Sequence, residues 1–170
     1  MRSILILLLL FLFLWSCKKE TTSPEPQNES NVIITGDSLE VGFTNFNFIK
    51  YDASGNESIR LVGTGNKDSL FIEIYNISLI TDSSKISLID TRDMKIETKL
   101  SYYFNYVSNI NPAPSGIEGY LIINSFEDNS FLKAEFSPNS HLSLLNYHNF
   151  SNLTLSTVEI QGTIKAKRIK

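Results

Sequence analysis

Residues 157–167 read TVEIQGTIKAK, and apolar and polar side chains alternate along the whole stretch. In a strand, successive side chains point to opposite faces, whereas a helix would scatter both kinds around its axis. The stretch therefore predicts a closing β-strand with one buried face and one exposed face. The residues predicted to face inward are Val158, Ile160, Gly162, Ile164 and Ala166.

The same alternation recurs in shorter runs along most of the chain before this strand. Residues 52–57, 65–68 and 127–130 are rich in Asp, Asn and Gly or Ser, and they predict tight hairpin turns. A phase slip at Thr44 and Asn45 predicts a β-bulge inside one long strand over residues 39–51. Residues 141–150 are ambiguous between a strand, an irregular crossing and helical turns.

These runs predict an all-β fold, an antiparallel β-sandwich of eight or nine strands that occupies residues 32–170 as a single domain. Hydrophobic residues make up 42% of the chain and aromatic residues 11%, which suffices for a folded core. The alternative is a small calycin-like β-barrel, which would enclose a cavity where a sandwich is filled with side chains.

Residues 1–16 have the pattern of a secretory signal peptide. Arg2 precedes an unbroken apolar block over residues 4–14, and small Ser16 follows. A block of about eleven residues is too short for a membrane-spanning helix, which needs roughly 20.

The four residues Leu14, Trp15, Ser16 and Cys17 resemble the lipobox of bacterial lipoproteins, although Trp15 stands where a smaller side chain is usual. The resemblance implies cleavage before Cys17 and a diacylglyceryl thioether on its sulfur. Cys17 is the only cysteine, so the chain can form no intramolecular disulfide. Two or three acyl chains at this residue would anchor the protein stably.

The residues after Cys17 predict where the anchored protein resides. Lys18 differs from the aspartate that retains such proteins in the inner membrane, so the resemblance implies the outer membrane, with a periplasmic or cell-surface orientation left open. Residues 17–31 then form a polar tether with two prolines, and its fourteen or so flexible residues would span roughly 20 Å.

The folded part is similar to small all-β lipoprotein domains of uncharacterised function. The similarity lies in residues 59–65, 70–76, 119–123 and 125–128, and in Gly162 with Thr163. A glycine expected within residues 131–137 is missing. The resemblance implies a fold class and no activity.

Several kinds of chemistry have no support in the sequence. The formal charge of −3 argues against nucleic acid, and the nucleophile-elbow and phosphate-loop motifs are absent. His141 and His148 have no further metal ligands spaced around them, and the acidic residues 52–57 fit a turn better than a calcium loop. We therefore expect no catalytic residues, no cofactor and no metal.

Tyr102, Tyr103 and Tyr106 are the candidate contact surface, because a strand with aromatic side chains on both faces exposes one of them unless both faces are covered. Core packing in a central strand is the alternative. The basic C-terminus, residues 165–170, either contacts lipid phosphates or is simply solvated.

The sequence thus predicts a monomeric, membrane-anchored lipoprotein that acts as a binding or structural module for an envelope protein or glycan. The alternatives are a carrier of a small apolar ligand in a barrel cavity and an enzyme whose site the sequence does not reveal.

Overall fold

Twelve strands carry nearly all the regular structure in the part of the chain that this computed structural model describes: residues 30–36, 39–53, 55–88, 90, 92–100, 105–106, 119–149 and 152–170. The strands are β1 (Asn31–Gly36), β2 (Leu39–Phe43), β3 (Asn45–Ala53), β4 (Asn56–Thr64), β5 (Ser69–Ile74), β6 (Lys85–Ser87), β7 (Met94–Lys99), β8 (Asn105–Tyr106), β9 (Tyr120–Glu127), β10 (Phe131–Phe136), β11 (His141–Asn149) and β12 (Asn152–Arg168). A 3₁₀ turn, η1 (Ile77–Leu79), follows β5. The predicted all-β class is confirmed.

The closing strand β12 organises the sheet, because four other strands pair with it. Its N-terminal part pairs with β11 and β1, and its C-terminal part with β10 and β3. The strand is longer than predicted, and its register is as predicted. The inward residues Val158, Ile160, Ile164 and Ala166 are buried, whereas Thr157, Gln161, Thr163 and Lys167 on the opposite face are exposed.

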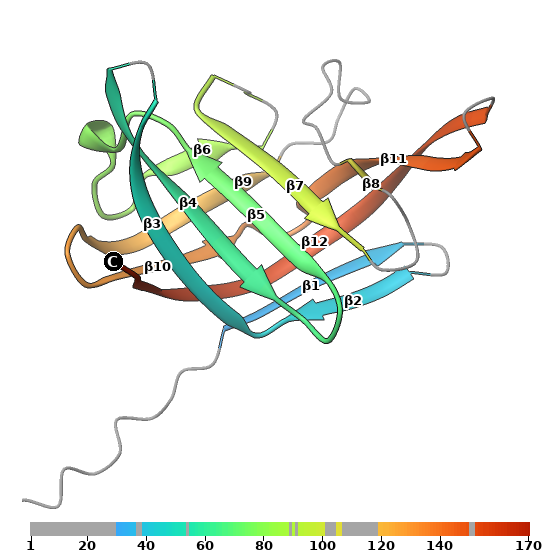
Figure 1. The fold of residues 1–170 in the computed structure, drawn as a ribbon, viewed down its shortest axis with the longest axis horizontal. Helices are drawn as coiled ribbons and strands as arrows, with labels where there is room; N and C mark the ends of the chain where they lie inside the picture. The colour runs from blue at the N-terminus through green and yellow to red at the C-terminus, as the bar shows by residue number, and fades with distance from the viewer. Residues whose placement is uncertain are drawn as a thin grey trace, which may run out of the picture.

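The strands form two layers in Figure 1. The front layer is made of β3, β4, β5 and β7, and it lies over a back layer that includes β9, β10, β12 and β1. The sheet follows the order β6-β9-β10-β12-β3-β4-β5-β7, with β1, β2, β8 and β11 off this path. In the described residues, β6 and β7 do not pair with each other, so the sheet folds over itself and does not close into the alternative barrel.

One apolar cluster fills the space between the two layers. Phe48, Leu61 and Ile72 of the front layer and Ile34 and Ile160 of the back layer are fully buried in it. Burying apolar surface at about 25 cal/mol per Å² is the main stabilising term for such a fold. Phe48 also packs against Phe126 of β9, with 6.2 Å between the ring centroids, so aromatic rings join the layers.

The predicted β-bulge at Thr44 and Asn45 is wrong, because the chain changes layer there. Strand β2 ends at Phe43 and, among the described strands, pairs with β1 only. Strand β3 begins at Asn45 and pairs with β4 and β12. The slip in alternation marks the point where the chain passes from the back layer to the front layer. Phe43 and Phe46, on either side of this point, both face the shared core.

Two further details of the predicted sandwich need correction. One pair is parallel: β12 runs beside β3, with Ala166 opposite Phe46. Parallel neighbours need a long connection, and here nearly the whole domain lies between them. The strands also outnumber the eight or nine expected, because β1 and β2 form their own hairpin and residues 141–149 form β11.

The three predicted turns are confirmed as hairpins. Ala53 pairs with Asn56, Thr64 with Ser69, and Glu127 with Phe131. At the first turn the Asp52 carboxylate accepts a hydrogen bond from the Gly55 N–H at 2.7 Å, and Gly55 has a φ of 86°. These acidic side chains therefore shape a turn, as expected.

No helix in the described part of the chain is long and apolar enough to cross a membrane.

Candidate contact face on the front layer

Most residues singled out from the sequence lie outside the part that the structure describes. Cys17, Tyr102 and Tyr103 are among them, and Tyr106 ends β8 with only its backbone described. The predicted tyrosine surface is therefore still a prediction. The described residues place a different aromatic and charged group on the outer face of the front layer.

This second group, the front face, consists of Tyr51 on β3, Arg60 on β4, Phe71 and Glu73 on β5, and Tyr75 just beyond β5. Their positions follow from strand alternation, because the neighbours Leu61, Ile72 and Ile74 point into the core. Hairpin register places Arg60 directly opposite Glu73. On the next strand, Lys95 lies opposite Glu73, and Glu97 lies opposite Phe71.

Arg60 and Glu73 form the centre of the front face. The Arg60 Nε donates to Glu73 Oε1 at 2.7 Å, and a second guanidinium N–H donates to the same oxygen. The Tyr75 hydroxyl donates to Glu73 Oε2 at 2.9 Å. The Glu73 side chain is only 11% exposed and that of Arg60 is 46% exposed, so the carboxylate is covered while guanidinium donors still reach solvent.

Tyr51 lies beside this pair, and the Arg60 Cζ is 5.8 Å from its ring centroid, within the range of a cation–π contact. Burial raises the pKa of Tyr51. Burial and the hydrogen bond to Glu73 raise the pKa of Tyr75 to about 12. The hydrogen bond to Glu73 is the main cause that raises the pKa of Arg60. Near neutral pH both phenols are therefore protonated and the guanidinium is charged.

The front face thus combines aromatic rings with hydrogen-bond donors on a four-stranded surface. Rings of this kind stack on sugars and on partner side chains, and a planar guanidinium recognises carboxylates and carbonyl groups with paired donors. The Tyr75 hydroxyl already donates its proton in a hydrogen bond to Glu73, so it is poorly suited to act as a general base. The arrangement favours recognition over bond-breaking chemistry.

The Tyr75–Glu73 bond predicts a specific alkaline transition. Because the folded pKa is raised from 10.0 to about 12, the stabilising contribution of Tyr75 is complete below pH 10 and is lost as pH rises through about 12. We expect tyrosinate absorbance to show a late-titrating group, and Tyr75→Phe to remove it. A Tyr75→Phe protein with an unchanged alkaline limb would contradict this assignment.

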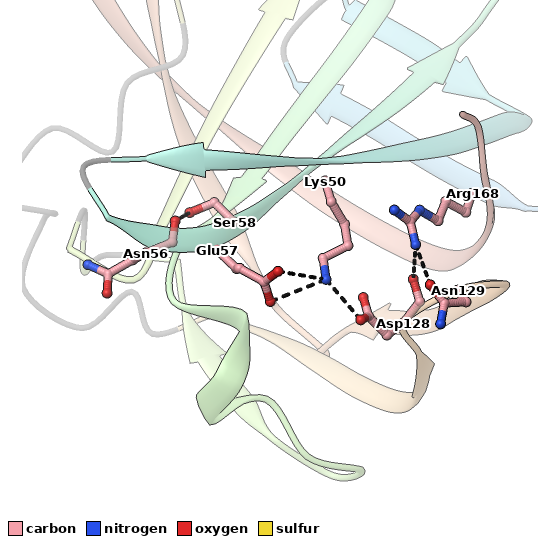
Figure 2. Close-up of polar contacts among 7 residues, drawn as sticks. All are labelled: Lys50, Asn56, Glu57, Ser58, Asp128, Asn129 and Arg168. Carbon is pink, nitrogen blue, oxygen red and sulfur yellow. Dashed lines mark hydrogen bonds and ion pairs between the residues drawn. The ribbon is translucent and has the colours of Figure 1, made fainter.

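A second polar cluster joins the two layers at one end of the core (Figure 2). Lys50 of β3 donates to both Glu57 carboxylate oxygens at 3.2 Å and to Asp128 Oδ2 at 2.8 Å. The bond to Asp128 is the main cause that raises the pKa of Lys50. Arg168 donates to Asn129 Oδ1 at 2.5 Å in the same turn. This cluster fixes the β9–β10 turn against the β3–β4 hairpin.

The other described side chains considered for catalysis or metal binding form separate hydrogen bonds and are not grouped into a site. Glu127 accepts a hydrogen bond from Ser130 Oγ at 2.6 Å, and Asp128 bonds to Lys50, so the two acids of this turn act separately. His141 donates from Nδ1 to the Asn139 carbonyl at 2.7 Å, and His148 lies on the same strand, β11. Among the described residues, no three His, Cys, Asp or Glu side chains are grouped to hold a metal ion.

Strand alternation alone puts Phe71, Glu73 and Tyr75 on one face of the strand over residues 69–75, but it does not connect them with Arg60. Hairpin register was the signal that could have done so. The tight turn over residues 65–68 aligns Thr64 with Ser69, and counting back along both strands brings Arg60 opposite Glu73.

No protein-family model matches the chain, and comparison with curated proteins and with solved structures likewise gave no match.

Proposed function

We propose that this protein is a lipoprotein of the bacterial outer membrane, anchored by acyl chains on Cys17, whose β domain acts as a binding module. The anchor is supported by the order of charge, apolar block, small residue and cysteine in residues 1–17, followed by a polar run up to the first strand. The chain enters the described domain at Ser30, immediately before β1.

The observation that carries the binding role is the front face. Its centre is an ion pair in which the covered Glu73 carboxylate, which also accepts a hydrogen bond from the Tyr75 hydroxyl, holds the guanidinium of Arg60 beside the ring of Tyr51. Such fixed donors lose little conformational freedom on binding, which favours recognition of a partner. A glycan or an envelope protein with exposed carboxylate or carbonyl groups fits this chemistry.

Two features favour this role over the alternatives. Side chains from both layers meet in one apolar cluster between the sheets, which suits a filled interior better than a cavity for an apolar ligand. The carboxylates of Glu57 and Asp128, at one end of the core, both form ion pairs with Lys50. They therefore belong to the polar cluster that joins the two layers and, among the described residues, do not lie beside a nucleophile.

Cys17→Ala tests the anchor. The cysteine thiol is the only group in the lipobox that a diacylglyceryl transfer can use, so the substitution should abolish incorporation of a clickable fatty acid and leave an uncleaved precursor. Metabolic labelling followed by membrane fractionation measures both effects. As a control, Ser78→Cys in the Cys17→Ala chain restores an exposed thiol away from the lipobox and should stay unlabelled. Label retained by Cys17→Ala would contradict the anchor.

A further inference from the structure

Three lysines lie together on the outer face of the back layer, on the opposite side of the sandwich from the front face. Lys133 of β10 lies directly opposite Lys165 of β12, and Lys167 follows two residues further along the same face. Lys167 is exposed, and the other two are half-buried. We name these three residues the lysine patch.

Among the described residues, no ion pair involves the lysine patch; the Lys133 ammonium instead lies over the ring of Phe131, 5.3 Å from its centroid. By contrast, Lys50 and Lys95 both form ion pairs. Like charges placed directly opposite each other on neighbouring strands destabilise a sheet, so Lys133 and Lys165 repel in the isolated domain. An anionic surface would relieve this repulsion. The patch is notable because the chain as a whole is acidic, with a formal charge of −3.

The lysine patch is also where the N-terminal segment joins the domain. The Ser30 hydroxyl accepts a hydrogen bond from the Lys165 N–H at 2.8 Å and donates one to the Lys165 carbonyl at 3.0 Å. Only residues 18–29 lie between Cys17 and this junction, so the two are at most about 45 Å apart when the segment is fully extended. A lipid on Cys17 would thus keep the patch close to the membrane.

We propose that the lysine patch is a membrane-docking surface that contacts the phosphate groups of anionic lipids. The proposal rests on the lipid anchor proposed above, which supplies the proximity. Basic side chains at an anionic surface each strengthen binding by about fivefold. Three lysines alone bind a membrane weakly, but weak binding is enough to dock the domain when a tether holds it at a high effective concentration near the lipid surface. Docking through the back layer turns the front face away from the lipid, toward partners.

The basic residues near the C-terminus fall into two groups in the structure. Arg168 bonds to the carbonyl of Asp128 and to the Asn129 side chain, so it belongs to the bridge between the layers. Lys165 and Lys167 point to the opposite face and are joined there by Lys133 from a different hairpin. The docking surface is therefore formed by the fold and cannot be read as a continuous basic run.

Vesicle flotation tests the proposal with an unlipidated chain that lacks Cys17, residues 18–170, which contains every described residue. The vesicles are phosphatidylcholine alone or an equal mixture with phosphatidylglycerol, at low salt. The patch variant carries Lys133→Gln, Lys165→Gln and Lys167→Gln. The control variant has the same charge change at three exposed lysines elsewhere, with Lys67→Gln, Lys85→Gln and Lys99→Gln.

We expect binding to the anionic vesicles only, weakened by roughly 100-fold in the patch variant and by a few-fold in the control. Circular dichroism confirms that both variants are folded. Equal loss in the two variants, or no preference for anionic vesicles, would overturn the proposal. Because this chain carries no acyl group, its result is independent of the Cys17 labelling, and failure of one proposal is distinguishable from failure of the other.

Discussion

Ile160→Asp should destabilise the domain by roughly 3 to 5 kcal/mol, a large part of the 5 to 15 kcal/mol that holds a typical domain together. Ile160 is fully buried in the central strand β12, directly opposite Ile34 of β1. A carboxylate there is surrounded by apolar side chains of the described core cluster, so it must remain unpaired or take up a proton. Urea unfolding followed by circular dichroism measures the loss.

Gln161→Asp is the matched control, because Gln161 is the next residue on β12 and lies on the exposed face. We expect it to cost less than about 1 kcal/mol, as surface substitutions usually do. Equal destabilisation by both substitutions would mean that the outer face of β12 is covered as well, and the two-layer arrangement would then be wrong.

Gly162→Ala should destabilise the domain by about 2 to 4 kcal/mol, although it adds only one methyl group. Gly162 has a φ of 120°, which L-residues rarely adopt. A Cβ at this position would lie 1.8 Å from the Asn31 carbonyl oxygen of β1, and backbone atoms cannot rotate away as a side chain does. We expect β1 to separate from β12 before the rest of the sheet unfolds.

Gly42→Ala provides the comparison, since Gly42 lies on strand β2 and a Cβ there meets no atom within 4 Å. Gly42→Ala should leave the free energy of unfolding unchanged or raise it slightly, because alanine lowers the conformational entropy of the unfolded chain. Urea melts give the two free energies, and amide hydrogen exchange in β1 locates the Gly162→Ala effect. A Gly162→Ala protein as stable as Gly42→Ala would contradict the close approach of β1 to β12.

The parts of the fold that depend on local pattern were predictable from the sequence. Alternation over residues 157–167 placed Val158, Ile160 and Ile164 in the core, because a one-residue error in register would have moved polar Gln161 and Thr163 inward. The tight turns were predictable for a similar reason. At the first turn, Gly55 supplies the backbone freedom that a reversal requires, and Asp52, three residues before it, supplies the side-chain acceptor.

The parts that depend on contacts between distant segments were missed. In the sequence, a slip in the apolar–polar alternation looks the same whether a strand contains a bulge or the chain turns a corner between two strands. Only the strands that pair with each segment reveal that Phe43 and Phe46 belong to different layers. The parallel pairing of β12 with β3 brings Ala166 beside Phe46 across nearly the whole domain, which no local signal encodes.

The candidate sites divide in the same way. The Arg60–Glu73 pair lies within one hairpin, so turn register could have found it. The Lys50–Asp128 bridge joins two hairpins separated in the sequence, and the opposition of Lys133 to Lys165 likewise needs the sheet order. Cys17 and the tyrosines near residue 103 lie outside the described residues, so their roles are still predictions.

Site-specific photo-crosslinking in intact cells tests most directly whether the front face binds an envelope partner. A photoreactive benzoylphenylalanine replaces Phe71 on the front face, and a control replaces Leu79, which is 73% exposed in η1 outside that face. The proposed function predicts a defined crosslinked product at Phe71 that Arg60→Ala diminishes and that the Leu79 control lacks. No product at Phe71, or the same products at both positions, would contradict the binding role of the front face.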